Sequence, residues 1–204
     1  MTALLRLSRA IDRITALIGR AVAWLVLAAV LVSTANAVIR KTIDFNPTGA
    51  LLRWYIQSSN SWLEMQWYLF SAVFLLAAAF TLQRNEHIRI DIVSGRLSRR
   101  ARNWIDLFGH VFMLTPFVAL MIYELAPYVS ASYRNGERSA NSGGLVIWPV
   151  KALMLAGFLL LLLQAVSEII KRVAVMRGVI PEPLPDHHVH PGAEGQLALR
   201  EPTA

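Results

Sequence analysis

The chain contains no cysteine, which excludes disulfide bonds, thiolate metal ligands and a cysteine nucleophile. Charged residues are also scarce, because Asp, Glu, Lys and Arg make up only 16% of the 204 residues. Soluble domains carry about 25% charged residues. Hydrophobic residues account for 55% of the chain, and its mean hydropathy is +0.47. This composition indicates an integral membrane protein with no room for a separate soluble domain.

Four apolar runs account for most of the hydrophobic residues. A helix needs about 20 mostly apolar residues to cross the hydrocarbon core of a bilayer. The second and third runs reach that length when they are extended across Glu64 and Glu124. Lipid offers no hydrogen-bond partner to the backbone, so each run should be helical. We predict an all-α membrane protein with four transmembrane helices and short interfacial amphipathic helices, the spans lying at about 21–39, 62–82, 105–127 and 148–168.

The distribution of basic residues predicts the orientation. With both termini in the cytoplasm, 14 of the 20 Lys and Arg residues are cytoplasmic and six are external. The short segment 83–104 alone holds six arginines. Cytoplasmic loops carry such an excess of Lys and Arg. The net charge of +7 is therefore attributed to these loops and to anionic lipid headgroups rather than to nucleic acid.

The first apolar run has two possible interpretations. Arginines precede it, and Ala35-Asn36-Ala37 resembles the cleavage site of a signal peptide. The run of 19 residues is longer than the hydrophobic region of a signal peptide, which has about 7 to 15 residues. We expect an uncleaved transmembrane helix.

The chain divides into three parts. Residues 1–20 form an amphipathic cytoplasmic segment, 21–172 form the membrane domain, and 173–204 form a Pro-rich tail that we predict to be disordered. Two interpretations of segment 1–20 stay open. It lies in the interface with its arginines toward anionic lipid, or it is the cytoplasmic start of the first helix.

Several local signals predict where helices begin and end. A turn at 46–49 precedes a short interfacial helix at 50–56, which 58–61 should break, with Asn60 or Ser61 capping the second transmembrane helix. A further interfacial helix is expected between Arg89 and Arg102. Ser98 should cap the third helix, and Trp148-Pro149 should open the fourth.

The second external loop and two charge pairs complete the local predictions. Asn135-Gly136 predicts a turn, and 142–144 predicts a flexible stretch. Helical spacing predicts ion pairs between Arg102 and Asp106 and between Glu168 and Arg172.

Histidine offers little support for a cofactor. His110 is the single histidine inside the apolar runs, whereas a membrane cytochrome usually needs two axial histidines on facing helices. We expect His110 to be a hydrogen-bonded packing residue. His187, His188 and His190 lie in the tail, where solvation is favoured over metal binding. No cofactor, metal site or enzymatic activity is predicted.

The acidic residues suggest a partner subunit rather than a transporter. A transporter that carries ions itself should have acidic groups or broken helices at mid-membrane depth. The acids here are expected at helix ends or in loops: Glu64, Glu86, Asp91, Glu124 and Glu137. Two alternatives stay open: an independent four-helix transporter working as an oligomer, and an anchor subunit of a membrane redox enzyme.

Several short motifs suggest a family. Segment 84–91 reads Arg-Asn-Glu-His-Ile-Arg-Ile-Asp and follows a Trp- and Tyr-rich stretch at 62–70. Further motifs lie at 136–139, 141–145 and 148–151. Together they resemble the small permease (DctQ-like) subunits of tripartite ATP-independent periplasmic (TRAP) transporters. The resemblance runs from about 11 to 171, although 42–57 is longer than the family pattern.

The resemblance implies a three-part importer in the bacterial inner membrane. A periplasmic solute-binding protein captures a carboxylate, and a large permease subunit carries it inward using a sodium gradient. The small subunit scaffolds the large one, helps to dock the binding protein, and binds neither substrate nor sodium. The expected partners are therefore the large permease subunit, the periplasmic binding protein and membrane lipids.

Two groups of residues are candidates for partner contacts on this interpretation. The first should order the cytoplasmic loop and consists of Glu86, Arg89 and Asp91. The second should face the partners at the external side and consists of Glu64, Trp67, Arg134, Glu137, Arg138, Ser139, Trp148 and Lys151.

Overall fold

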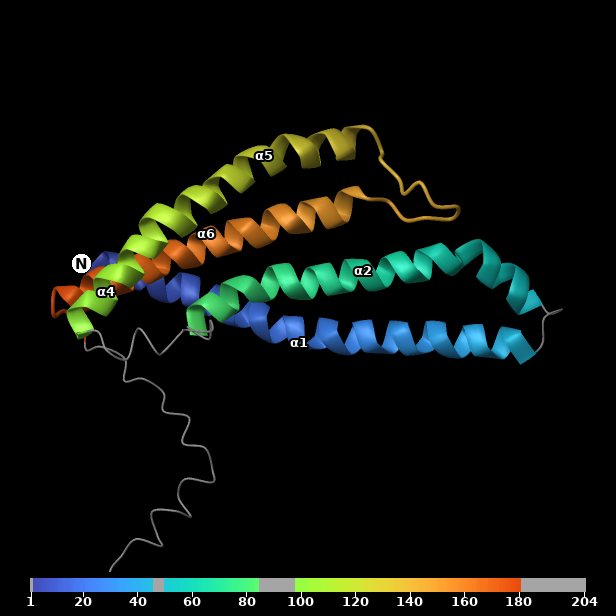
Figure 1. The fold of residues 1–204 in the computed structure, drawn as a ribbon, viewed down its shortest axis with the longest axis horizontal. Coiled ribbons are helices and arrows are strands. Elements are labelled where there is room, and N and C mark those ends of the chain that lie inside the picture. Colours follow the sequence, from blue (N-terminus) through green and yellow to red (C-terminus); the bar gives the residue numbers. More distant parts are fainter. Residues whose placement is uncertain (1, 46–49, 85–97, 181–204) are drawn as a thin grey trace, which may run out of the picture.

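The computed structural model describes residues 2–45, 50–84 and 98–180 (Figure 1). It is helical, and four of its helices are long and apolar enough to cross a membrane, which confirms the predicted fold class. The elements are α1 (Thr2–Phe45), α2 (Ala50–Arg84), α4 (Arg99–Phe108), a π-helical turn (Gly109–Leu114), α5 (Thr115–Arg134) and α6 (Trp148–Met176).

Helix α6 lies at the centre of the arrangement. The antiparallel pair α1 and α2 packs on one side of α6, and α5 packs on another (Figure 1). Among the described helices, α5 has extensive contacts only with α6, while α4 and the π-helical turn also reach α6. The helix pair α1–α2 and helix α5 are therefore connected chiefly through α6.

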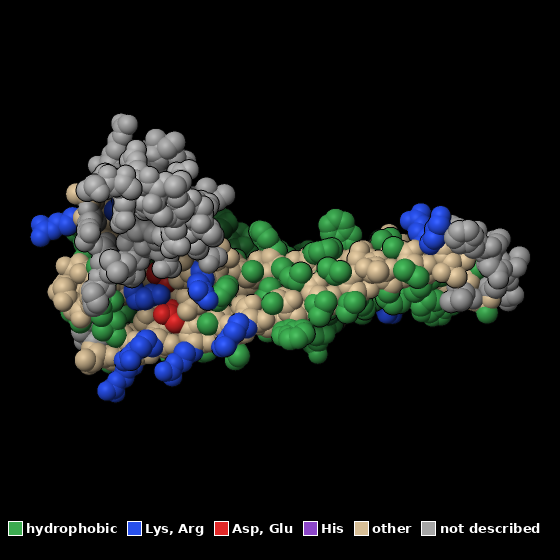
Figure 2. All heavy atoms as spheres, turned by 90° about the horizontal axis from the view of Figure 1, so that it is seen from below, with side chains coloured by type: hydrophobic (Ala, Val, Ile, Leu, Met, Phe, Trp, Pro, Cys, Tyr) green, Lys and Arg blue, Asp and Glu red, His purple; other side chains and the backbone are tan. Residues whose placement is uncertain are grey.

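The bundle has two distinct ends. Thr2 and Met176 lie at one, the terminal end, and the connection 135–147 lies at the other, the loop end (Figure 1). Hydrophobic side chains cover the middle of the face in Figure 2, and Lys and Arg lie toward both ends. An apolar belt between charged ends is the pattern expected of a protein that spans a bilayer.

Helix α1 is continuous over 44 residues, a length of about 66 Å at 1.5 Å per residue. Segment 2–20 is therefore the first part of this helix rather than a separate element. Its buried positions recur at helical spacing, and Ser8, Ile11 and Thr15 are all less than 10% exposed. Arg9 and Arg13 are exposed. A hydrocarbon core of about 30 Å accommodates only part of such a helix.

The predicted break at 58–61 is wrong, because α2 runs through it without interruption. Ser58 donates its hydroxyl hydrogen bond to the Trp54 carbonyl at 2.8 Å. A serine that bonds to the carbonyl four residues earlier is tolerated inside a helix. Segment 50–56 is accordingly the first part of α2, and neither Asn60 nor Ser61 caps a helix.

Two predicted helix starts are confirmed. Ser98 has extended backbone angles and accepts a hydrogen bond from the Ala101 amide at 3.2 Å, which makes it the N-cap of α4. Helix α6 begins at Trp148 with Pro149 in its first turn. The predictions for 46–49, most of the helix predicted between Arg89 and Arg102, and the tail after 180 lie outside the described residues.

The π-helical turn separates α4 from α5. The Thr115 amide and its hydroxyl both donate to the His110 carbonyl, the hydroxyl at 2.7 Å. Pro116 follows directly. In a regular α-helix its ring would clash with the carbonyl four residues earlier. The wider π-helical turn before the proline relieves this clash. Such turns occur where the regular backbone hydrogen bonds of an α-helix are interrupted.

Close packing of α6 on α2 depends on Gly157. A Cβ atom at this position would lie 2.9 Å from the Leu75 Cβ and 3.0 Å from the Leu75 carbonyl oxygen. Small residues let membrane helices approach each other in this way. Gly157 therefore acts as a contact point rather than as a place where α6 is loosened.

We predict that Gly157→Ala lowers the thermal midpoint of the purified protein in detergent. The added methyl group forces α2 and α6 apart, which should destabilise the protein by about 1–3 kcal/mol. Gly109→Ala is the matched control, because a Cβ there meets no atom within 4 Å. Equal midpoints for the two variants, measured by tryptophan fluorescence on heating, would contradict the close approach.

Candidate functional site

The connection between α5 and α6, residues 135–147, is a folded loop. Gly136 has a φ of +57°, so the predicted turn at Asn135-Gly136 is confirmed. The Ser139 amide donates to the Leu145 carbonyl at 2.9 Å, and the Ile147 amide donates to the Glu137 carbonyl at 3.0 Å. These bonds bring the two sides of the loop together as a short hairpin.

Glu64 of α2 holds this loop through its carboxylate. Its Oε1 accepts hydrogen bonds from the Ser139 hydroxyl and from the Asn141 side-chain amide, the latter at 3.0 Å. Its Oε2 accepts from the Leu145 amide at 2.6 Å. Hydrogen bonds to an ionised acceptor are shorter and stronger than neutral ones. One carboxylate therefore ties the loop between α5 and α6 to α2.

Other α2 side chains extend this attachment. Asn60 donates to the Ser142 carbonyl at 2.9 Å, Ser61 donates to the Gly143 carbonyl, and Tyr68 donates to the Val146 carbonyl at 3.0 Å. Gly143 has a φ of +70°, and a Cβ there would overlap the Gln57 carbonyl oxygen. The stretch 142–144, predicted as flexible, is thus bound to the side of α2.

Lys151 fixes the other side of the loop. Its ammonium lies 2.5 Å from the Glu137 carboxylate and 3.7 Å from the centre of the Tyr128 ring. The residue is only 6% exposed, and a buried lysine needs such partners. The Lys151 hydrogen bond in turn holds the pKa of the Glu137 carboxyl below its ordinary value of 4.5.

The predicted external residues therefore divide into two sets. The first set holds the loop in place, because Glu64 binds Ser139 and Lys151 binds Glu137. The others lie on the surface or against a neighbour. Trp67 is 71% exposed, Arg134 and Arg138 are exposed, and Trp148 packs edge-on against Tyr133 at 5.2 Å. The cytoplasmic candidates Glu86, Arg89 and Asp91 lie outside the described residues.

A polar cluster at the terminal end was not predicted from the sequence. Asp12 of α1 is its centre. The Asp12 carboxylate accepts from Gln164 and Ser167 at 2.9 Å each and from Lys171 at 3.3 Å. Gln83 of α2 donates to the Asp12 carbonyl at 2.9 Å. The cluster thus joins the ends of α1, α2 and α6.

The signal for this cluster was present in the spacing. Ser8 and Asp12 lie on the same side of α1 as the apolar Ile11, and their partners Gln164, Ser167 and Lys171 recur at helical spacing on α6. The Ser8 and Ser167 hydroxyls are 2.7 Å apart. Buried polar side chains need hydrogen-bond partners. A polar stripe on the buried face of one amphipathic helix therefore predicts a second polar stripe on the helix that packs against it.

The predicted ion pair between Glu168 and Arg172 is wrong. Glu168 contacts Lys171 at 2.5 Å, and Arg172 contacts Asp106 of α4 at 3.0 Å. Arg172 also donates to Asn103 at 3.0 Å. Arg172 thus reaches across to α4, while Glu168 pairs with a different residue of its own helix.

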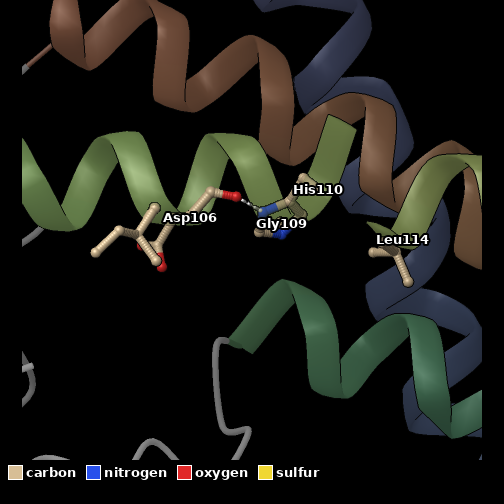
Figure 3. A pocket seen from close by; sticks show the side chains of 5 residues that line it. Asp106, Gly109, His110 and Leu114 are labelled. Carbon is tan, nitrogen blue, oxygen red and sulfur yellow. Dashed lines mark hydrogen bonds between the residues drawn. The ribbon is translucent and has the colours of Figure 1, made fainter. Parts of the chain in front are cut away.

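His110 is hydrogen-bonded within its own helix. Its Nδ1 lies 2.5 Å from the Asp106 carbonyl oxygen, as expected for a packing histidine (Figure 3). Both residues line a shallow pocket together with Ile105, Gly109 and Leu114. In residues 2–45, 50–84 and 98–180, no group of three or more His, Asp or Glu side chains is placed to hold a metal.

Two acidic residues lie inside helices rather than at their ends, contrary to the prediction. Glu64 is 14 residues into α2, and α5 continues for ten residues beyond Glu124. Glu64 has the three donors described above. The Glu124 carboxylate makes no hydrogen bond or ion pair with any residue that the structure describes.

These features define a class of protein: a four-helix membrane protein in which the ion pairs between described residues lie at the two ends of the bundle. Residues 48–175 match the model of the DctQ component of tripartite ATP-independent periplasmic transporters, and the chain belongs to that family. It is a small membrane subunit of a TRAP transporter. No curated protein and no solved structure matches the chain.

We predict that Glu64→Gln loosens the loop from α2. The Gln side chain has the same shape, but it carries no charge. It also replaces one of the two oxygen acceptors with an NH2 group, which cannot accept a hydrogen bond from the loop. Hydrogen bonds to charged groups contribute about 1.5–3 kcal/mol each. Hydrogen exchange at the amides of Ser139 and Leu145 should therefore become about tenfold faster or more.

Glu124→Gln is the matched control for this experiment in the isolated chain. It is the same substitution in another membrane-spanning helix, α5, on a carboxylate with no partner among the described residues. Hydrogen exchange at the amides of Ser139 and Leu145 should be unchanged in this variant. Equal exchange rates in the Glu64→Gln variant and the unmodified protein would contradict the role of Glu64.

The Glu137–Lys151 pair predicts a pH dependence of stability. The folded-state pKa of Glu137 is lowered from 4.5. Stabilisation by this group is therefore complete above the unfolded-state pKa and is lost as the pH falls through the folded-state value. The thermal midpoint of Glu137→Gln should lie below that of the unmodified protein at neutral pH, and the difference should disappear in acid. A difference that persists or grows in acid would contradict the assignment.

Proposed function

We propose that this chain is the scaffold subunit of a sodium-driven importer of carboxylate solutes. In this proposal it braces the large permease subunit in the membrane. Its loop end helps to dock the periplasmic solute-binding protein. Family membership supports the proposal, because the family is one component of a transporter with three.

The observation that carries the scaffold role is how the polar groups of the described helices are used. The charged side chains that bond between described segments, which do not include Glu124 of α5, are gathered at the two ends, where Glu64 and Asp12 each accept hydrogen bonds from other segments. The shallow pockets formed by 105–114 and by 100–104 with 175–180 both lie at the terminal end. This arrangement is suited to holding helices in position rather than to passing a solute between them.

The proposed orientation follows the charge distribution. The termini and segment 83–104 lie in the cytoplasm, and the loop end faces the periplasm, so the chain is a multi-pass protein of the bacterial inner membrane. The excess of Lys and Arg on one side supports this assignment. Glu86, Arg89 and Asp91 then belong to the cytoplasmic connection, where they help to order it against the large subunit.

The proposed docking surface consists of Arg134 and Arg138 at the loop end. Both residues are exposed, while the loop that carries Arg138 is held in place by Glu64 and Lys151. A rigid loop loses little conformational entropy when a partner binds. Two exposed positive charges are suited to acidic side chains on the binding protein.

We predict that the double substitution Arg134→Glu and Arg138→Glu reduces solute uptake by the reconstituted three-part transporter. Reversing exposed charges at an interface slows association, by about tenfold at low salt. Uptake and binding-protein docking are measured together in vesicles. The control is Arg177→Glu, an exposed arginine at the terminal end, which should leave docking unchanged. Unchanged docking in the double variant would exclude this surface.

A further inference from the structure

Helix α5 presents a carboxylate, Glu124, that has no hydrogen-bond or ion-pair partner among the described residues and has apolar neighbours along the helix. Glu124 is exposed, and its neighbours Tyr123 and Leu120 are 75% and 58% exposed. Of the four candidate spans, the one that contains α5 has the smallest share of buried residues. Carboxylates on membrane helices almost always face a protein interior or pair with another group. The described part of this chain supplies neither for Glu124.

The proposed orientation puts the end of α5 at the membrane surface, and Glu124 then lies within the bilayer. Tyr133 contacts Trp148, so the end of α5 is level with the start of α6. Glu124 precedes Arg134, the last residue of α5, by ten residues, which is about 15 Å at 1.5 Å per residue. That is about half of a hydrocarbon core of 30 Å. Side chains on a helix point toward its N-terminus, so this carboxylate is directed away from the nearer membrane surface.

Glu124 belongs to a regular stripe along α5. Phe117, Leu120, Glu124, Tyr128 and Ala131 recur at intervals of three and four residues and are all exposed. This spacing places them on one side of the helix. The buried residues of α5 form a different stripe, Val118, Leu125 and Ser132. At the margin of the Glu124 stripe, Phe117 and Tyr128 also contact Phe158 and Lys151 of α6. Helix α5 therefore has one face packed within the bundle and a second face with a single acidic group in its middle.

We propose that the Glu124 stripe is the surface on which α5 binds a membrane helix of the large permease subunit, and that this helix carries a basic side chain opposite Glu124. The inference rests on the proposed scaffold function and names the face that performs it. Charge complementarity carries the assignment, because lipid tails cannot compensate a carboxylate but a Lys or Arg of a partner helix can.

The test is co-purification of the tagged chain with its large subunit in mild detergent. Glu124→Gln, which keeps the shape and removes the charge, should reduce the retained large subunit by about tenfold, and Glu124→Lys should reduce it further. Tyr123→Gln introduces the same amide one position away, on a different side of α5, and should retain the large subunit. Thermal unfolding of the isolated Glu124→Gln chain should match that of the unmodified chain, which separates binding from folding.

The possible results separate this inference from the proposed function. If the unmodified chain does not retain the large subunit, the scaffold function itself fails. If both Glu124 variants retain it as well as the unmodified chain does, only the assignment of this face fails, and the stripe faces lipid.

Because the chain has no other cysteine, Leu120→Cys gives a unique cross-link site. A disulfide-linked homodimer in the assembled complex would also overturn the proposal.

A charge exchange provides the positive result. Lys and Arg residues in the membrane helices of the large subunit are replaced by Glu one at a time, each against Glu124→Lys. One of these replacements should restore retention to at least about half of the original level, because the pair is then reversed rather than lost. Failure of every replacement to restore retention would overturn the pairing.

Discussion

The inability of lipid to form hydrogen bonds is the constraint on which this structure depends. Every polar group that enters the bundle must find its partner in the protein. Glu64 meets this condition at the loop end with donors from the α5–α6 loop, and Asp12 meets it at the terminal end with donors from α2 and α6. Between these two points the contacts are mainly apolar, so the two carboxylates fix the register of the helices and Gly157 fixes their separation.

The same constraint explains how rigid and adaptable parts are distributed. The loop 135–147 is attached on both sides, through Glu64 and through Lys151, so its exposed Arg138 is presented on a fixed support beside Arg134 at the end of α5. Helix α5 is different, because it packs chiefly on α6 and has a large exposed apolar surface. A subunit with a preformed surface at one end and an incompletely covered helix along its length is suited to assembly with other chains.

The sequence predicted those features that depend on neighbours along the chain. Four long apolar runs identified the spans, and Ser98 and Pro149 identified two helix starts, because hydropathy and capping are local properties. The Asp12 cluster was not predicted, since its partners lie more than 150 residues away on α6. The serines at 58–61 were misinterpreted because the same hydroxyls that end a helix in a turn can bond to carbonyls of their own helix. Glu64 was identified as a candidate, but its role required the folded loop.

The π-helical turn at Gly109–Leu114 has a consequence for the helical phase of the third span. The residues of α5 buried against α6, Val118, Leu125 and Ser132, follow a seven-residue repeat. Asn103 of α4 is also buried, but it precedes Val118 by fifteen residues, one more than two repeats. The wide turn absorbs that extra residue, so α4 and α5 both face α6 although their sequences are out of phase. A chain with one residue fewer in this turn would keep both contacts in a plain α-helix, but the ring of Pro116 would then clash with the carbonyl four residues before it. A deletion elsewhere in the span would rotate one contact by about 100° away from α6.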